Sequence, residues 1–341
     1  MFQPKYDLTK QLLTNITQVE RLYGQLESLK IPQKLELNLE RDNLIQSAFV
    51  SNSIEGNPLS KREVTNLLLS DRIAVNRDEK EVTNYFEILK NLNQLNDKPI
   101  NIDLTLKIHR NLMQGVKDQI KGEIRNEKVV IGKYLSQLKT LPKLKVKHEP
   151  PYHKKNLIKK ELQKLYIWLE HEQNLPIAIK TGVFHHHFVY LHPFIDGNGR
   201  VARLLTALIF LKSSYFVNKY FVLDDYYDID RLMYSDKLHS ADKGDKTQWL
   251  EYYSKGVMYS LQAALSKMEN AVFKLKVEER PTKKERQVLE IIQETNQVTS
   301  TDIATTLKVS RQQAHNLLKA LVEKGFLEKA GKTKKSFYFL K

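Results

Sequence analysis

The chain has 341 residues, with 55 Lys and Arg against 40 Asp and Glu and a formal net charge of +15. This length allows two domains or more around a sizeable core. The absence of cysteine excludes disulfides and a thiolate zinc site, and it agrees with a reducing cytoplasm. The first residues lack the apolar segment of a signal peptide, and no stretch approaches the roughly 18 apolar residues of a membrane span. We therefore expect a cytoplasmic protein without a membrane partner.

A mainly helical fold is expected because leucine, isoleucine, lysine and glutamate dominate the composition, whereas glycine and proline are scarce. Apolar residues at helical spacing predict helices over 9–29, 35–49, 61–69, 79–92, 104–113, 156–169, 177–191, 228–241 and 247–265. One of these helices contains three consecutive histidines, His185, His186 and His187. Because neighbouring residues on a helix point about 100° apart, the three side chains cannot converge on one metal ion.

A segment of twelve residues, HPFIDGNGRVAR from His192 to Arg203, gathers a base, an acid, two glycines and two arginines in one helix–loop–helix corner. The free N–H groups and the dipole at the start of the second helix favour phosphate. Gly197 and Gly199 allow the backbone to turn sharply and to approach a ligand closely. With Asp196 as a carboxylate for Mg²⁺, the segment predicts a site for a nucleoside triphosphate.

This segment resembles, without a mismatch, the signature HPFx(D/E)GN(G/K)RxxR of the Fic (filamentation induced by cyclic AMP) family. The resemblance implies transfer of AMP from ATP to a Tyr, Thr or Ser hydroxyl of a protein, with pyrophosphate leaving. A kinase-like branch of the family has lysine at the position of Gly199, so glycine here favours AMP transfer over phosphate transfer. The competing interpretation is an ordinary polar loop between two core helices.

The same resemblance assigns a role to each residue of the signature. His192 is the general base that takes the proton of the target hydroxyl, a task suited to the near-neutral pKa of an unperturbed histidine. Asp196 holds Mg²⁺, and Arg200 and Arg203 bind the β- and γ-phosphates. The nucleotide-binding residues are therefore Gly197, Asn198, Gly199, Arg200, Arg203 and, beside the adenine, Tyr234. Core packing explains a tyrosine at position 234 equally well.

A second segment, Ser51 to Asn57, lies far upstream of the signature. Ser51 and Glu55 are separated by four residues on a short helix that Gly56 would end, so both side chains project from one face. The segment resembles the inhibitory motif (S/T)xxxE(G/N) of the same family. By that resemblance Glu55 pairs with Arg203 and blocks productive binding of ATP. Two other interpretations stay open: a simple capped turn, and a glutamate that orients water to remove AMP from a modified target.

The residues from Lys121 to Arg125, followed by an apolar run, resemble the start of the flap of the family, a β-hairpin across the active site. We expect this hairpin over 129–147, where its edge can hold an extended target segment by main-chain hydrogen bonds. The predicted flap is long and basic, with Lys133, Lys139, Lys143, Lys145 and Lys147. These lysines could bind an acidic surface of the target protein. A charged loop that only contacts solvent explains them equally well.

The last sixty residues or so form a separate basic region. From Arg280 to the end there are 13 Lys and Arg against 6 Asp and Glu. Helices are predicted over 283–294, 301–307 and 310–324, and strands over 325–329 and 336–340, an arrangement that resembles a winged helix-turn-helix. The residues expected to face DNA are Arg311, Gln312, Gln313, His315, Asn316 and Lys319, with Lys332, Lys334 and Lys335 of the wing on phosphates. Protein contacts or dimerisation are the alternative use of this domain.

These observations predict a mainly α protein: a Fic-type helical bundle with a small β-hairpin flap, followed by a winged helix-turn-helix. Four segments are expected: an N-terminal helical region (1–100), a catalytic domain (101–265), a linker (266–282) and the winged helix (283–341). The leading hypothesis is an ATP- and Mg²⁺-dependent protein adenylyltransferase that modifies another protein or itself, is inhibited by Glu55 and forms a homodimer. The alternatives are removal of AMP by the same site, and a DNA-binding regulator whose Fic domain senses a nucleotide.

Overall fold

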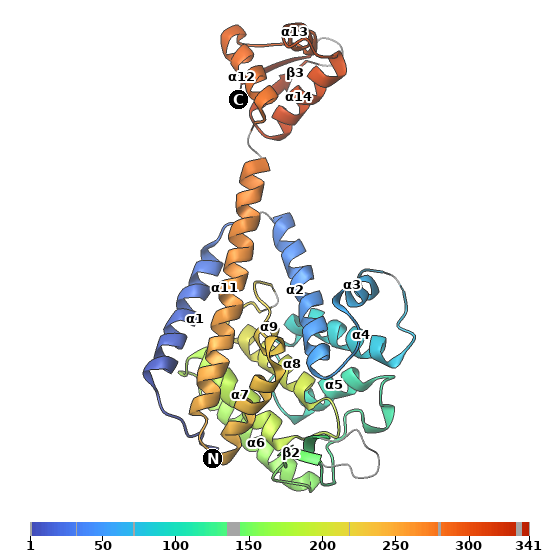
Figure 1. Cartoon of the computed structure of the whole chain (residues 1–341), viewed down its shortest axis with the longest axis vertical. Helices are drawn as coiled ribbons and strands as arrows, with labels where there is room; N and C mark the ends of the chain where they lie inside the picture. Colours follow the sequence, from blue (N-terminus) through green and yellow to red (C-terminus); the bar gives the residue numbers. More distant parts are fainter. Residues whose placement is uncertain are drawn as a thin grey trace. The chain divides into compact units, whose positions relative to one another are not determined.

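The computed structural model of the chain describes residues 2–31, 33–70, 72–134, 144–217, 219–278, 281–331 and 336–340. These residues form two compact units, Met1–Ser266 and Lys267–Lys341. Both units are mainly helical, which confirms the predicted fold class (Figure 1). Within the described residues, no helix has both the length and the apolar character that crossing a membrane requires.

The first unit is a bundle of helices with one small hairpin (Figure 1). Its helices are α1 (Lys10–Ser28), α2 (Gln33–Ile54), α3 (Lys61–Leu69), α4 (Arg77–Lys90), α5 (Ile102–Met113), α6 (Lys155–His171), α7 (Ile177–Leu191), α8 (Asn198–Lys212), α9 (Asp225–Ile229), α10 (Arg231–Ser240) and the part of α11 (Thr247–Glu278) that ends at Ser266. Short 3-10 turns lie at η1 (Leu92–Leu95), η2 (Asp118–Ile120) and η3 (Ala241–Lys243), and the strands are β1 (Ile131–Tyr134) and β2 (Leu144–His148).

Helices α7 and α8 form the centre of this bundle. Both are buried almost all round, as their nearly continuous apolar sequences require. Helix α7 ends at His192 and α8 begins after Gly197, and both of these cap residues adopt left-handed backbone conformations. The residues between the two helices therefore form a tight corner, in which Phe194 is buried and Ile195 is exposed.

Three helix boundaries differ from the predicted ones. Helix α2 is continuous through its last turn, so Ser51 lies on a long helix rather than on a short separate one. The single helix predicted over 228–241 is broken into α9 and α10 at Asp230, whose side chain accepts the N–H of Met233 at 2.9 Å. Helix α11, predicted to end at residue 265, continues to Glu278, into the range assigned to a linker.

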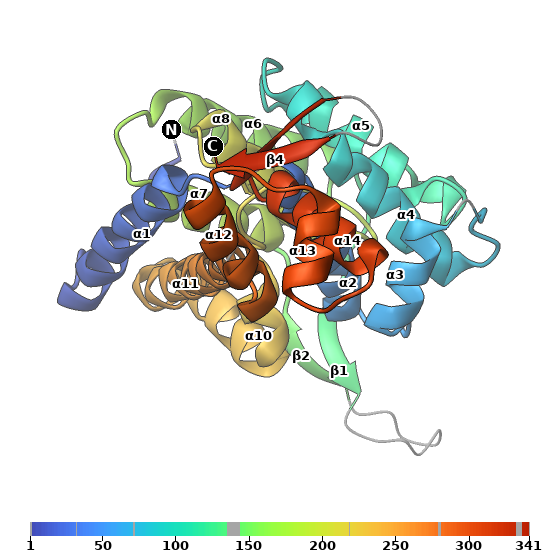
Figure 2. The same cartoon turned by 90° about the horizontal axis from the view of Figure 1, so that it is seen from above.

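The predicted hairpin is present as the antiparallel pair β1 and β2, with Gly132 opposite Val146 (Figure 2). Lys139 and Lys143 of the predicted basic flap lie outside the described residues. Near the end of β2, the Lys147 ammonium donates to Ser235 at 3.0 Å and lies 3.5 Å from Asp236, both on α10. The hairpin is therefore attached to the helical bundle at the end of its second strand.

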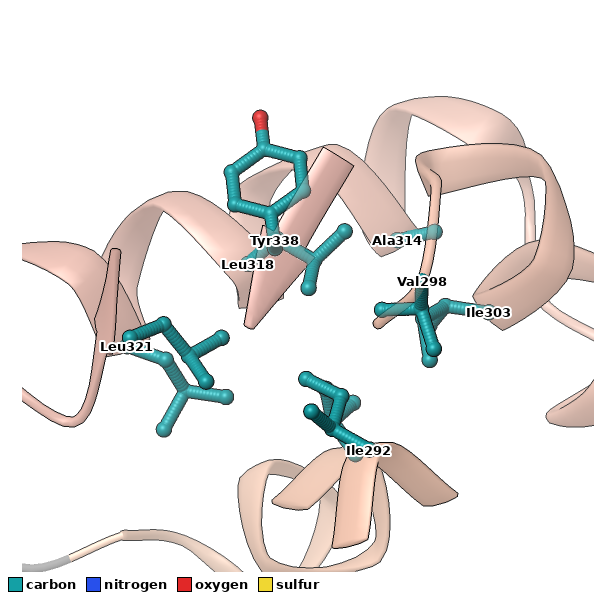
Figure 3. Close-up of a cluster of buried hydrophobic side chains, with 9 residues drawn as sticks. Ile292, Val298, Ile303, Ala314, Leu318, Leu321 and Tyr338 are labelled. Carbon is teal, nitrogen blue, oxygen red and sulfur yellow. The ribbon is translucent and has the colours of Figure 1, made fainter. Parts of the chain in front are cut away.

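The second unit contains α12 (Lys283–Thr295), α13 (Ser300–Thr306), α14 (Arg311–Glu323), β3 (Leu327–Ala330) and β4 (Phe337–Leu340). Its strands pair antiparallel, and Val298 forms an additional bridge to Tyr338. Each helix starts with a capping box, at Thr282, Thr299 and Ser310. One apolar cluster fills the space between the three helices and the strands (Figure 3). The order and packing of these elements are those of the predicted winged helix.

Candidate active site

His192 lies at the corner that follows α7. Its backbone has φ 47°, and its N–H donates to the carbonyl of Phe188 at 3.2 Å, which closes the helix. The buried guanidinium of Arg125 holds this corner from the other side: Nε donates to the His192 carbonyl at 2.6 Å and Nη2 to that of Leu191 at 3.2 Å. The N–H of Arg125 also donates to Pro193 at 3.0 Å. Arg125 therefore fixes the unusual backbone that presents His192.

His192 is only partly exposed, and its surroundings disfavour a charged ring. Burial lowers the pKa of His192 to about 4, and the nearby His148 and Arg125 act in the same direction. The near-neutral pKa expected for His192 from its residue type is therefore wrong. At neutral pH the His192 imidazole is uncharged and can accept a proton.

The corner between His192 and α8 is closed by its own polar groups. The Asn198 side chain exchanges two hydrogen bonds with the backbone of Phe194, at 2.9 and 2.8 Å. Gly197 has φ +79°, and a Cβ there would lie 2.3 Å from Cε of Met113. Another residue here would have to displace the end of the Met113 side chain, and its backbone would be strained by the positive φ.

His109, on α5, supports the same corner and was not singled out in the sequence. Its Nδ1 accepts the N–H of Gly122 at 3.0 Å, so its Nε2 carries the proton that bonds to the carbonyl of Asp196 at 3.1 Å. Its ring stacks on Phe194 with 3.7 Å between centroids. Burial lowers the pKa of His109 to about 4. The neutral ring of His109 thus links α5 by hydrogen bonds to Gly122, at the start of the flap, and to the backbone of Asp196.

The Asp196 carboxylate is partly exposed and lies among positive groups. Its Oδ1 accepts the N–H of Gly197 at 2.6 Å and lies 3.3 Å from Nη2 of Arg200, while Oδ2 contacts the ammonium of Lys117. Burial alone would raise the pKa of Asp196, but Lys117 and Arg200 outweigh it and hold that pKa below its ordinary value. An ionised carboxylate that already holds a cationic group suits a divalent ion that also binds phosphates.

Arg200 and Arg203 are both buried on the first turns of α8. Arg200 lies 3.4 Å from the carboxylate of Glu81 on α4. Arg203 donates from Nε to the Ser51 hydroxyl at 2.7 Å and from Nη2 to the Ser51 carbonyl at 2.9 Å. Its Nη2 also donates to Oε1 of Glu55 at 2.7 Å. The last turn of α2 thus covers the guanidinium with both residues of the upstream motif.

Glu55 also fills the space above the glycine loop. A Cβ built on Gly199 would lie 2.2 Å from Oε1 of Glu55 and 3.0 Å from Nη1 of Arg203. The carboxylate of Glu55 therefore occupies the hollow that the absence of a side chain at Gly199 creates. Glu55 is therefore a negative group that an arginine holds near the start of a helix, and a phosphate at this position would meet the same surroundings.

Asp224 is a second carboxylate beside Arg203 that the sequence did not indicate. Its Oδ2 lies 3.9 Å from Nε of Arg203, and its side chain is buried. Burial raises the pKa of Asp224 to about 7, although Arg203 acts in the opposite direction. If Glu55 moves away from Arg203, the Arg203 guanidinium therefore still has the carboxyl group of Asp224 beside it.

Residues 99–210, which contain this corner, match the Fic/DOC family, and residues 281–335 match the MarR family. The chain carries a Fic domain followed by a MarR-family winged helix.

Relatives with assigned names support the first of these assignments. The chain is 28% identical over 228 residues to the protein adenylyltransferase fic-1 of Caenorhabditis elegans, covering 64% of this chain and 41% of that protein. It is 31% identical over 162 residues to a probable protein adenylyltransferase of Aquifex aeolicus, covering 44% and 46%. The match thus spans less than half of the length of these relatives.

Solved structures share the fold. A Fic family protein from Desulfovibrio desulfuricans matches with a TM-score of 0.68 at 23% identity, covering 100% of this chain and 98% of that one. Fic-1 of C. elegans matches with a TM-score of 0.61 at 23% identity, covering 76% and 73%.

Tyr234 lies in the core of the first unit. Its hydroxyl and Nε2 of His185 are 2.9 Å apart, and its ring stacks on Tyr227 at 4.7 Å. Only 6% of the residue is exposed. Tyr234 also interacts with the guanidinium of Arg203, so it packs in the core beside the glycine loop, and its place beside an adenine stays a prediction.

In the winged helix, the residues proposed for DNA lie in different environments, and His315 is partly exposed on α14. Arg311, Gln312, Asn316 and Lys319 are exposed on α14, opposite the buried Ala314 and Leu318. Gln313 instead completes the capping box by accepting the N–H of Ser310 at 3.1 Å, a role that the sequence analysis did not give it. Lys332, Lys334 and Lys335 lie outside the described residues.

Proposed function

We propose that this chain is a protein adenylyltransferase that transfers AMP from ATP to a hydroxyl of a protein side chain. The observation that supports this proposal best is the corner itself. It gathers a neutral His192, an ionised Asp196 and the buried Arg203 around one glycine loop. A nucleotide sensor would need the charges but not the base. The named relatives agree with the proposal, since they are adenylyltransferases.

In the proposed reaction, the neutral imidazole of His192 takes the proton of the target hydroxyl as its oxygen attacks the α-phosphorus of ATP. One O–P bond forms to the target oxygen, and the bond between the α-phosphorus and the bridging oxygen breaks. Pyrophosphate then leaves with the electron pair of that bond. Arg200 and Arg203 bind the negative charge that gathers on the leaving phosphates.

Asp196 would hold Mg²⁺ in this reaction, with substrate phosphates and water as further ligands. The ion would neutralise phosphate charge and orient the phosphate chain. Lys117 now bonds the outer oxygen of Asp196, so its ammonium would have to give up this contact. The residue is half-buried and flexible enough to do so.

Glu55 would act as an inhibitor of transfer. Its carboxylate bonds Arg203 and fills the hollow above Gly199, where a phosphate of ATP would otherwise lie. Two negative groups cannot share this small space at low cost. Transfer would therefore require the last turn of α2 to move away, or Glu55 to turn outward.

The experiment that tests this function uses ATP labelled on the α-phosphate, with Mg²⁺, the full chain and candidate protein targets, including the chain itself. The Glu55→Gly protein should become labelled with the mass of one AMP, and Glu55→Gly combined with His192→Ala should not. His153→Ala, in which an exposed histidine is removed, is the matched control in the Glu55→Gly background. Label that persists without His192 would contradict the proposed base, and ATP binding without label in every variant would favour the sensor.

Removal of AMP by the same site is the second candidate for the enzyme. It is favoured by one observation, the 30% exposure of the Glu55 side chain, which leaves room for a water molecule beside it. In this case release of AMP from a labelled target would be lost in Glu55→Gly. An unchanged rate of release in that variant would exclude this direction.

DNA binding by the winged helix would place the enzyme near a promoter or add a regulatory function. The exposed polar face of α14, with Arg311 and Lys319, favours this use. A homodimer, which the sequence resemblance suggested, is part of the same proposal because palindromic DNA sites pair with dimers. Light scattering of the full chain measures its mass directly, and a monomeric mass would remove this part.

A further inference from the structure

A second cluster of ionisable side chains lies in the Fic domain, outside the residues assigned to ATP. It joins His148 at the end of β2, His239 on α10 and Asp242 on η3. One nitrogen of each histidine and one oxygen of Asp242 lie within 4.8 Å of one another. Nδ1 of His148 lies 2.7 Å from Oδ2 of Asp242, and Nδ1 of His239 lies 3.0 Å from the same oxygen.

The two nitrogens of His148 both face oxygen acceptors. Its Nε2 lies 3.0 Å from the carbonyl of Tyr190, which can only accept, so Nε2 carries a proton. A neutral ring then presents the lone pair of Nδ1 to the carboxylate of Asp242, which also has only lone pairs. A cation must lie between Nδ1 and Oδ2, either a second proton on the ring or a metal ion.

The surroundings favour a metal ion in this place. A histidine ligand usually donates its other N–H to a backbone carbonyl, as His148 does to Tyr190. The second oxygen of Asp242 is held at 3.0 Å by Nε2 of His186, whose Nδ1 accepts from the ammonium of Lys246 at 2.9 Å. These outer contacts fix the orientation of the carboxylate, and they leave its Oδ2 directed at the two Nδ1 atoms.

We propose that His148, His239 and Asp242 bind one divalent transition-metal ion of the zinc class, at a site separate from that of Mg²⁺. Two imidazole nitrogens and one carboxylate oxygen are ligands that Zn²⁺ or Co²⁺ prefers and that Mg²⁺ does not. Bonds of about 2.0–2.1 Å in tetrahedral geometry place ligand atoms about 3.3 Å apart. The observed separations of 2.7 and 3.0 Å would need to open by about 0.6 and 0.3 Å to reach this value. A water molecule can complete the site, because His239 and Asp242 are 15% and 19% exposed.

The position of the cluster gives the ion a structural role. His148 belongs to the flap strand and bonds Tyr190, two residues before His192, and the rings of His148 and His192 are 6.4 Å apart. An ion at His148 would therefore join the flap to α10 beside the end of the helix that presents His192. Binding of the metal does not depend on the proposed AMP transfer, so the two ideas can fail separately.

The test is a titration of the full, tag-free chain with Co²⁺ after treatment with a chelator. Excess Mg²⁺ keeps oxygen-only sites such as Asp196 occupied during the titration. Equilibrium dialysis gives the stoichiometry, and the visible absorption of Co²⁺ reports nitrogen ligands in a site of low coordination number. We expect one Co²⁺ per chain, bound at least about tenfold more weakly by His239→Ala and by His148→Ala. His153→Ala, which removes an exposed histidine elsewhere, should bind as the wild type does.

Two results would overturn the proposal. The first is the absence of stoichiometric binding by the wild-type chain. The second is binding that His239→Ala leaves unchanged. His148 is buried, so the His148→Ala protein must also show an unaltered circular dichroism spectrum. If that protein is unfolded, the test rests on Co²⁺ binding by His239→Ala, in which a partly exposed residue is replaced. A rise in the unfolding temperature with Zn²⁺ in the wild type, absent in His239→Ala, would support the site independently.

Discussion

Glu55 and Arg203 are 148 residues apart in the chain, yet Oε1 of the glutamate accepts a hydrogen bond of 2.7 Å from Nη2 of the arginine. Ser51, one helical turn earlier, accepts from the same guanidinium through both its hydroxyl and its carbonyl. The end of α2 therefore occupies the side of α8 on which the glycine loop opens. Any ligand that needs the charge of Arg203 must first displace this contact.

Replacing Glu55 should therefore increase transfer. A hydrogen bond to a charged group contributes about 1.5–3 kcal/mol, which corresponds to roughly a ten- to hundredfold rise in the rate with Glu55→Gly. Glu55→Gln, which keeps the shape and removes the charge, should give a smaller rise. The measurement is the initial rate of labelling from ATP labelled on the α-phosphate. A Glu55→Gly rate at or below that of the wild type would remove the inhibitory role.

Replacing His192 should act on the reaction and not on binding. With Glu55→Gly as the background, His192→Ala should lower the rate about 10²- to 10⁴-fold and leave the Kd of ATP nearly unchanged. The Kd is measured by isothermal titration, and labelling gives the rate. A large loss of ATP affinity would instead indicate that His192 holds the nucleotide.

The pH dependence of transfer follows from the lowered pKa of His192. Its pKa is lowered to about 4 from the ordinary value of 6.5, so the ring is already neutral, and active as a base, above about pH 5. Protonation of His192 should therefore not change the labelling rate of the Glu55→Gly protein between pH 8 and 6. It should lower this rate only as the pH approaches 4. The same depressed pKa stabilises the folded chain above about pH 6.5 and loses this contribution as the pH falls toward 4. A rate profile with a midpoint near 6.5 would contradict the neutral base.

Several features of the fold and site followed from local sequence. The apolar run from Ile177 to Leu191 predicted α7 with its observed bounds, because a fully buried helix needs such a run. The pairing of Glu55 with Arg203 was expected from the resemblance of two short motifs. Capping residues such as Ser310 marked the start of α14.

The remaining features depend on contacts between residues distant in the chain. Arg125 looked like part of the flap, and its four carbonyl partners include Leu191 and His192, which only the fold brings to it. Asp224 gave no sign of burial beside Arg203, because acidic residues are usually exposed. His148 lies just beyond the hairpin predicted over 129–147, and nothing in the sequence marked it as the end of a strand. In each case the sequence shows the type of the residue but not the distant residue that it contacts in the fold.

Arg125 gives a prediction about stability and positioning. Arg125→Lys keeps the charge but cannot donate to the carbonyls of His192, Glu127 and Tyr152 together, because an ammonium lacks the planar fork. The free energy of unfolding should fall by roughly 2–4 kcal/mol, since buried carbonyls lose their donors. Denaturant unfolding measures this change, and Arg62→Lys, at an exposed arginine, is the control. The labelling rate should also fall, because the left-handed corner of His192 loses its support.

The exposed face of α14 gives the last prediction, which concerns DNA. Lys319 and Arg311 are exposed, and the ammonium of Lys319 lies 3.7 Å from Glu323 in a pair that water screens. If the helix enters a major groove, Lys319→Ala should weaken duplex binding and lower the slope of log K against log salt concentration by about one, and Arg311→Ala should also relax sequence preference. Lys284→Ala, on α12, removes the same charge away from this helix and is the matched control. Fluorescence anisotropy over a range of salt concentrations gives both quantities. Equal effects of Lys319→Ala and Lys284→Ala would mean that the winged helix attracts DNA only by its net charge, and no binding at all would favour its use in protein contacts.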